Sequence, residues 1–160
     1  MRKVNISQIT EKESSSPSGK YHSFGRHVSI ALGRIPNSDS KASSHPFDLE
    51  LCRIPSGAAL CPFHAHSAQW ELYLVISGTG KIRDKDGFHE LTPGDAVVFP
   101  PHEPHQICND GKDDLVFYII ADDPPGEACY YPDSDKWNVP SHGKRTILKG
   151  QEVNYFAGEE

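Results

Sequence analysis

Short apolar runs separated by turn-forming residues make up the middle of the chain. The clearest runs cover residues 48–54, 71–76, 96–99 and 115–121 and are rich in Val, Ile, Leu, Tyr and Phe. Gly, Pro, Asn and Asp gather between them, as in Thr-Pro-Gly-Asp at 92–95. Strands at such regular spacing, with no long helical pattern, are typical of a sandwich or barrel. The pattern therefore predicts an all-β fold.

The same pattern divides the chain into three zones. Residues 1–23 are rich in Ser, Glu and Lys and have little apolar surface to bury, so we expect a flexible N-terminal extension. Residues 24–123 contain the strand runs and form the predicted barrel. Residues 124–160 are rich in Pro and Gly, and we expect a C-terminal tail packed on the barrel rather than a second domain.

Composition and charge narrow the range of partners and compartments. Lys plus Arg is 16 and Asp plus Glu is 22, which gives a formal net charge of −6 over 160 residues. An acidic chain is a poor match for nucleic acid or for an anionic membrane. Because the sequence has no run of about 18 apolar residues and no signal-peptide core, we expect a cytoplasmic protein. The four cysteines fit no zinc spacing, so we expect reduced thiols.

Three histidines and one glutamate occur at a spacing that suits a metal site. His64 and His66 are two residues apart, so in a strand both imidazoles point to the same side. Glu71 opens the next apolar run, and His105 lies just beyond the turn that follows residues 96–99. Imidazole and carboxylate ligands together suit one divalent transition metal, namely Zn, Fe, Mn or Ni. We give no ligand role to His22, His27, His45, His89 and His142.

Two motifs in this region resemble those of the cupin superfamily. The first, G-x5-H-x-H-x3–4-E-x6-G, corresponds to Gly57, His64, His66, Glu71 and Gly78. The second, G-x5-P-x-G-x2-H-x3-N, corresponds to Gly94, Pro100, His105 and Asn109. Gly57 lies one residue further from His64 than is usual, and His102 replaces the middle glycine of the second motif. The resemblance covers about residues 48–121 and is closest to small single-domain microbial cupins.

The resemblance implies a double-stranded β-helix, or jelly-roll barrel, with His64, His66, Glu71 and His105 as ligands of one metal ion at the barrel mouth. It does not fix the reaction, because cupins include dioxygenases, isomerases, decarboxylases and non-enzymatic binders. We expect a metal-dependent enzyme of the dioxygenase, isomerase or decarboxylase type that acts on a small polar molecule.

Two alternatives remain open at this point. One is a non-catalytic module that binds a small ligand or a metal. The other is a sugar or sugar-phosphate isomerase or epimerase, which would need basic residues at the mouth to bind phosphate. Lys81 and Arg83 share one face of a predicted strand, but the sequence does not show whether that face is inward.

Three residues near the predicted mouth are candidates for acid–base catalysis. His102 stands in a turn where the motif has glycine, and Glu103 follows it directly. Tyr73 lies on the same strand face as Glu71. Each also has a structural alternative, as a turn residue, a solvated side chain or part of the barrel wall.

Strand alternation makes a prediction about assembly. If Glu71 points into the barrel, Tyr73 and Val75 point inward with it. The opposite row, Trp70, Leu72, Leu74 and Ile76, then points outward. An apolar row of this kind is normally covered, either by the chain's own residues around 27–32 or by a second subunit. We expect a homodimer, since a two-fold pair is the commonest soluble assembly.

Overall fold

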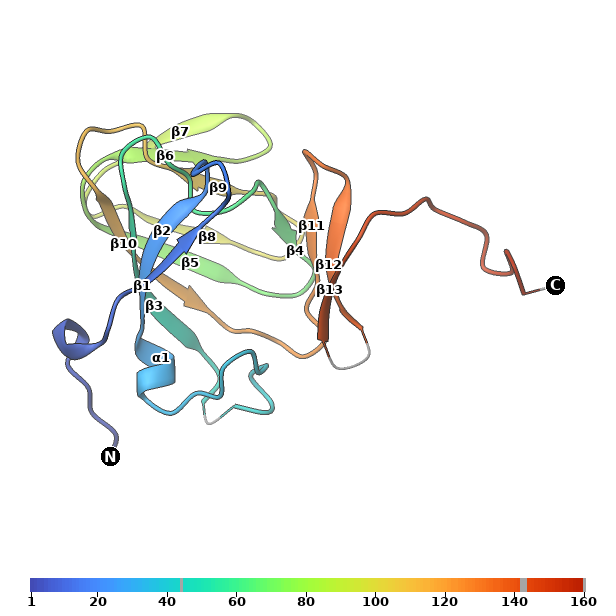
Figure 1. Cartoon of the computed structure of the whole chain (residues 1–160), viewed down its shortest axis with the longest axis horizontal. Helices are drawn as coiled ribbons and strands as arrows, with labels where there is room; N and C mark the ends of the chain where they lie inside the picture. Colours follow the sequence, from blue (N-terminus) through green and yellow to red (C-terminus); the bar gives the residue numbers. More distant parts are fainter. Residues whose placement is uncertain (44, 142–143, 160) are drawn as a thin grey trace.

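The structure is a computed structural model that describes residues 1–43, 45–141 and 144–159. Short strands form nearly all of its regular structure (Figure 1). In chain order the elements are η1 (Ile6–Gln8), β1 (Lys12–Ser15), β2 (His22–His27), α1 (Val28–Ala31), β3 (Asp48–Ile54), β4 (Ala65–His66), β5 (Glu71–Ser77), β6 (Gly80–Arg83), β7 (Phe88–Leu91), β8 (Ala96–Phe99), β9 (Gln106–Cys108), β10 (Leu115–Ala121), β11 (Cys129–Tyr131), β12 (Lys136–Ser141) and β13 (Lys144–Leu148).

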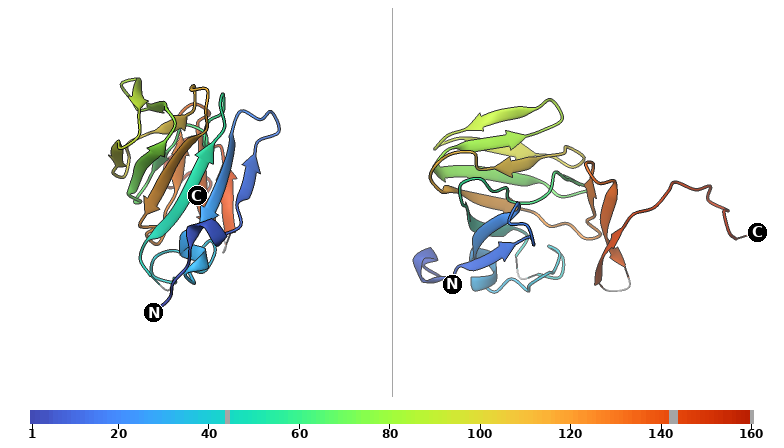
Figure 2. Two further views of the ribbon diagram at one scale, coloured as in Figure 1. Left: turned by 90° about the vertical axis from the view of Figure 1, so that its left-hand side faces the viewer. Right: turned by 45° about the horizontal axis from the view of Figure 1, so that its top comes forward.

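Two antiparallel sheets enclose the barrel interior. One has the order β1-β2-β3-β10-β5-β8, and the other has the order β7-β6-β9. In Figure 2, β3 and β10 run side by side at the centre of the larger sheet. Both sheets contribute to one buried cluster, which comprises Cys52, Ile54, Ala58, Tyr73, Val75, Ile82, Leu91, Phe99, Ile107, Leu115 and Phe117. The predicted all-β, jelly-roll fold is confirmed.

The apolar runs of the sequence correspond closely to strands. β3, β8 and β10 have the expected limits, and β5 extends one residue beyond the expected end. In β5, Tyr73 and Val75 are each 2% exposed, whereas Ile76 is 46% exposed. The predicted alternation of inward and outward side chains is therefore present, because each sheet buries one face only.

Part of the N-terminal zone, residues 1–23, forms regular structure. Lys12–Ser15 forms strand β1, which pairs with β2, and β2 in turn pairs with β3. All four side chains of β1 are exposed, so the backbone ladder rather than burial defines this strand. A ladder without an apolar face leaves no hydrophobic pattern in the sequence.

The C-terminal zone joins the barrel through a strand. β11 pairs with β4, and the hairpin β12–β13 continues this sheet in the order β13-β12-β11-β4. The residues after β13 extend away from the barrel (Figure 1). Among the described residues no helix is long and apolar enough to cross a membrane. The zone beyond residue 123 is thus connected to the strand that carries His66.

Candidate metal centre

Backbone pairing brings the four predicted ligands together from separate parts of the chain. The His64 N–H donates to the His105 carbonyl at 3.1 Å, and the His105 N–H donates to the His64 carbonyl at 2.8 Å. His66 lies in β4, and Glu71 opens β5 opposite Phe99 of β8. His64, His66 and His105 are all buried, and the Glu71 side chain is 12% exposed. The two motifs therefore meet at one end of the barrel.

Four side-chain atoms converge on one point. His64 Nε2 lies 3.1 Å from His66 Nε2, and Glu71 Oε2 lies 3.2 Å from His66 Nε2 and 3.0 Å from His105 Nε2. With bonds of about 2.1 Å to an ion, neighbouring ligands are about 3.0 Å apart at right angles and about 3.4 Å apart in a tetrahedron. The observed spacing fits right-angled, octahedral coordination, which keeps further positions open. These residues could therefore hold one divalent ion.

Backbone carbonyls orient two of the imidazoles. His64 Nδ1 lies 3.0 Å from the Pro62 carbonyl, and His105 Nδ1 lies 3.1 Å from the Glu103 carbonyl. A carbonyl can only accept, so each Nδ1 carries the hydrogen and each Nε2 has a free lone pair. Partners of this kind are usual for histidines that bind a metal.

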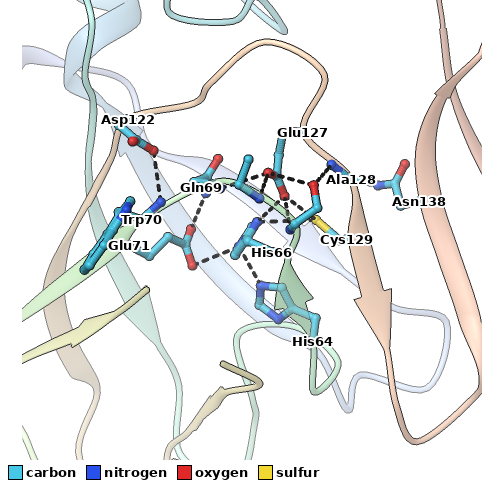
Figure 3. A network of polar contacts seen from close by, with 12 residues as sticks. His64, His66, Gln69, Trp70, Glu71, Asp122, Glu127, Ala128, Cys129 and Asn138 are labelled. Carbon is cyan, nitrogen blue, oxygen red and sulfur yellow. Dashed lines mark hydrogen bonds and ion pairs between the residues drawn. The ribbon is translucent and has the colours of Figure 1, made fainter. Parts of the chain in front are cut away.

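His66 has a charged partner instead, which the sequence analysis missed. Its Nδ1 lies 2.9 Å from Oε1 of Glu127, in the segment between β10 and β11 (Figure 3). The thiol of Cys129 lies 3.5 Å from the same nitrogen. The only local indication was the run Cys-Tyr-Tyr at 129–131, which is typical of a strand. The partner of that strand is distant in sequence, and the motifs do not identify it.

Burial and hydrogen bonding together set the charges of the site. Burial lowers the pKa of His64 to about 4, so its ring is neutral at pH 7. Burial alone would raise the pKa of Glu71, but the contacts with His105 and His66 outweigh it and hold that pKa well below its usual range. Burial and the adjacent Glu71 charge raise the pKa of Tyr73. The site thus combines a carboxylate, a neutral imidazole and a phenol that keeps its proton.

The three acid–base candidates lie in different environments. The Tyr73 hydroxyl donates to Glu71 Oε2 at 2.6 Å and lies 3.1 Å from His105 Nε2. His102 has a φ of 71° and an exposed ring, and its backbone N–H donates to the His66 carbonyl at 2.7 Å. The Glu103 side chain is exposed. The left-handed backbone at His102 accounts for the glycine that the motif has there.

The basic residues of β6 point away from the site. Ile82 is 4% exposed and belongs to the core, so Lys81 and Arg83 on either side of it face outward. Lys81 pairs with Asp110 and Arg83 pairs with Asp133, each at 2.6 Å. The sequence did not decide which way Lys81 and Arg83 point, and in the structure both side chains point outward.

The remaining histidines and the cysteines are separate from the four converging atoms. Besides His102, four described histidines lie outside this group: His22, His27, His45 and His89. His142 lies outside the described residues. All four cysteines are free, in agreement with the expected reduced thiols.

A small cavity opens beside Glu71. Its volume is about 140 Å³. The other residues that line it are Asp48, Glu50, Gln69, Ile119, Ala121 and Asp123. Of the four converging residues, only Glu71 lines this cavity.

Comparison with known proteins agrees with this architecture. A family model described as the cupin domain matches residues 50–121. An uncharacterised protein of Acanthamoeba polyphaga mimivirus is 32% identical over 102 residues, which are 61% of this chain and 52% of that protein. An oxalate-binding protein of Thermotoga maritima is 28% identical over 68 residues, which are 42% of this chain and 55% of that protein. The chain spans about half the length of these two relatives.

One solved structure covers nearly the whole fold. The sugar phosphate isomerase of the cupin superfamily from Silicibacter pomeroyi superposes with a TM-score of 0.76 at 23% identity, over 96% of this chain and 97% of that chain. Identity at this level shows the fold alone. The family model, the jelly-roll barrel and the two motifs at its mouth together identify residues 50–121 as a cupin domain.

Proposed function

We propose that the protein binds one divalent transition metal ion on His64, His66, Glu71 and His105 and acts on a small polar molecule next to it. The observation that carries the proposal is the convergence of three Nε2 atoms and one carboxylate oxygen with neighbour distances of 3.0–3.2 Å. Imidazole nitrogens and a carboxylate oxygen are the donor types that divalent transition metals accept as ligands.

The chain's own residues would orient the ion and its ligand. An ion held here would supply Lewis acidity to a bound oxygen atom. The Tyr73 hydroxyl donates a hydrogen bond to Glu71 and so holds that carboxylate in place. The cavity of about 140 Å³ beside Glu71 has room for a molecule of only a few heavy atoms.

The reaction is a dioxygenation, an isomerisation or a decarboxylation, and the identity of the metal decides among them. His102, Glu103 and Tyr73 stay candidates for moving protons. Of the three, Tyr73 contacts two of the converging side chains. A non-catalytic binding module would have the same metal site, and turnover of a substrate would distinguish the enzyme from the module.

A sugar-phosphate isomerase is the alternative suggested by the structural neighbour, and it needs a cation for the phosphate. Lys81 and Arg83 point outward into ion pairs with Asp110 and Asp133. No Lys or Arg is among the residues that line the small cavity in the described part of the chain. An uncharged polar substrate fits these surroundings better than a phosphate ester.

Elemental analysis of the tag-free protein, purified without chelators, tests the metal site. We expect about one equivalent of Fe, Mn, Ni or Zn per chain. A screen of catechols, sugars and small diacids with the loaded protein then tests for turnover. Full-length, folded protein that takes up no metal even after incubation with each ion would refute the proposal.

We also propose that the protein is a homodimer. Val98 is 51% exposed and Ile76 is 46% exposed on the outer face of the large sheet, and Trp70, which directly precedes β5, is 51% exposed. The segment 27–32, which might have covered this row, lies beyond β3 instead, because β2 extends the sheet at that edge. The outer face of β5 is therefore left for a second copy.

Sedimentation at micromolar concentration tests the dimer. A species of twice 17.7 kDa is expected, and Leu74→Glu, which puts a charge into the half-buried outward row, should shift it toward the monomer. A wild-type protein that sediments as a monomer would exclude the dimer.

A further inference from the structure

The three imidazoles of the site are oriented in two different ways. His64 and His105 face the carbonyls of residues only two positions away in sequence. His66 faces the carboxylate of Glu127, 61 positions away. Glu127 lies outside the cupin-domain match, which ends at residue 121. One ligand therefore depends on a part of the chain that the family motifs do not include.

Glu127 does more than contact one ring. Its carboxylate also accepts the backbone N–H groups of Ser67, Ala68 and Gln69, at 3.1, 2.8 and 2.9 Å (Figure 3). These residues form the turn between His66 and Glu71. The Gln69 side chain in turn donates to Glu71 Oε1 at 3.0 Å. A single carboxylate thus fixes the chain between two of the four converging ligands.

The position of Glu127 is itself fixed by pairing of the following strand. Cys129 of β11 lies opposite His66 of β4. The Ser67 N–H donates to the Ala128 carbonyl at 2.8 Å, and the Ala128 N–H donates to Ser67 Oγ at 2.9 Å. The Glu127 side chain is only 10% exposed, so its charge depends on these donors for stabilisation.

We propose that Glu127 is a positioning residue of the metal centre: it accepts the Nδ1 hydrogen of His66 and holds the ring with Nε2 toward the ion. This inference rests on the proposed metal site. It makes the segment after β10 part of that site. Removal of such partners in other metalloproteins typically lowers metal affinity about 10- to 100-fold.

The same atoms could instead bind a second metal ion. The donor atoms of His66, Glu127 and Cys129 lie within 4.8 Å of one another. The contacts favour the positioning role. Both Glu127 oxygens already accept backbone N–H groups, and Oε1 also faces His66 Nδ1. Metal stoichiometry distinguishes the two uses.

The test is a cobalt(II) titration of the full-length apoprotein in competition with a chelator. Glu127→Gln removes the charge but keeps the shape, and Glu152→Gln makes the same charge change at an exposed position of the same zone. His66→Ala reports on the metal site itself. We expect one equivalent of cobalt in the wild type, an affinity about 10- to 100-fold lower in Glu127→Gln, and no change in Glu152→Gln.

The outcomes separate this inference from the proposed function. If wild type and His66→Ala bind cobalt equally, the proposed metal site is wrong and this inference falls with it. If His66→Ala loses cobalt but Glu127→Gln keeps wild-type affinity and absorption spectrum, only the role of Glu127 is refuted. Two equivalents in the wild type and one in Glu127→Gln would also refute it, in favour of a second ion.

A measurement on the wild type alone covers the case in which Glu127→Gln does not fold. Nitrogen-15 NMR of the zinc-loaded protein identifies which His66 nitrogen carries the hydrogen. We expect a protonated Nδ1 with slowed exchange and a metal-bound Nε2. A metal-bound Nδ1 would overturn the proposal.

Discussion

The same strands carry polar side chains toward one end of the barrel and apolar side chains toward the other. β3 has Glu50 toward one end and Ile54 at the other, and β5 has Glu71 at one end and Val75 toward the other. At the apolar end, Ile54, Leu115 and Phe117 are completely buried. At the other end, imidazoles and carboxylates face one another.

This contrast separates stability from chemistry. Burial of large apolar side chains stabilises the folded state by about 1.5–3 kcal/mol each. Burial of charged or imidazole groups costs free energy unless each group has a partner. The apolar end therefore holds the sheets together, whereas the groups at the polar end depend on one another as partners. Mutations at the two ends should have separable effects.

The largest effect on stability is expected at the apolar end. Phe117→Ala leaves a cavity between the two sheets and should lower the free energy of unfolding by about 3–5 kcal/mol. Urea denaturation of the apoprotein followed by circular dichroism measures it. The molecules that remain folded should bind metal as the wild type does. A loss below about 1 kcal/mol would contradict the assignment of the core to this end.

At the polar end the main expected effect of a mutation is on metal affinity. His105→Ala removes a direct ligand, so metal affinity should fall by more than the roughly 100-fold upper limit for a positioning partner. The free energy of unfolding of the apoprotein should also fall, because His105 is buried, packs on Phe99 and is a polar partner of the buried Glu71. His89→Ala, at an exposed histidine outside the group, is the matched control. Equal metal affinity in both variants would break the comparison.

The pH dependence of metal affinity tests the same difference between the polar and the apolar end. Burial lowers the pKa of His66, but contacts with Cys129, Glu127 and Glu71 outweigh it, so its pKa in the apoprotein is raised. The ring then carries a proton at pH 7 that must leave when a metal binds. Metal affinity should therefore fall as the pH is lowered from about 8 to 5, and the His66 proton alone contributes about tenfold for each pH unit.

His64 adds no further proton in this range, since its pKa is lowered to about 4. The loss of stability in Phe117→Ala should show no comparable pH dependence, because the core cluster around it is apolar apart from groups such as Cys52, whose pKa is raised by burial. Calorimetry in buffers of different ionisation enthalpy counts the protons released on metal binding. Metal affinity that is flat across the range would show that His66 is not a ligand.

The smallest effect is expected at the turn beside the site. His102→Gly relieves a left-handed backbone at φ 71° but makes the unfolded chain more flexible. The two contributions oppose each other, so stability should change by less than about 1 kcal/mol. Metal affinity should remain that of the wild type, as measured by the same cobalt titration. A large loss of affinity would place the His102 ring at the metal.

The sequence was most informative where burial is one-sided and local. The limits of β3 and β10 and the inward direction of Tyr73 follow from alternation along single strands. The N-terminal strand Lys12–Ser15 escaped detection because its side chains are all exposed. Only backbone hydrogen bonds to β2 define it, and these leave no trace in residue type.

The candidate metal site was also predictable from the sequence only in part. His64, His66, Glu71 and His105 stand in recognisable motifs, and the structure brings them together. Glu127 stands in no motif, and its role depends on the pairing of β11 with β4 across 61 residues. Pairing over such a separation depends on the whole fold, which no local pattern encodes.

A crystal structure of the metal-loaded, full-length protein, with anomalous scattering measured at the absorption edge of the metal, tests the central claim most directly. We expect one anomalous peak per chain, about 2.0–2.2 Å from Nε2 of His64, His66 and His105 and from a carboxylate oxygen of Glu71. A peak on other residues, or an apolar-end location, would contradict the division of the barrel into a stabilising end and a metal-binding end.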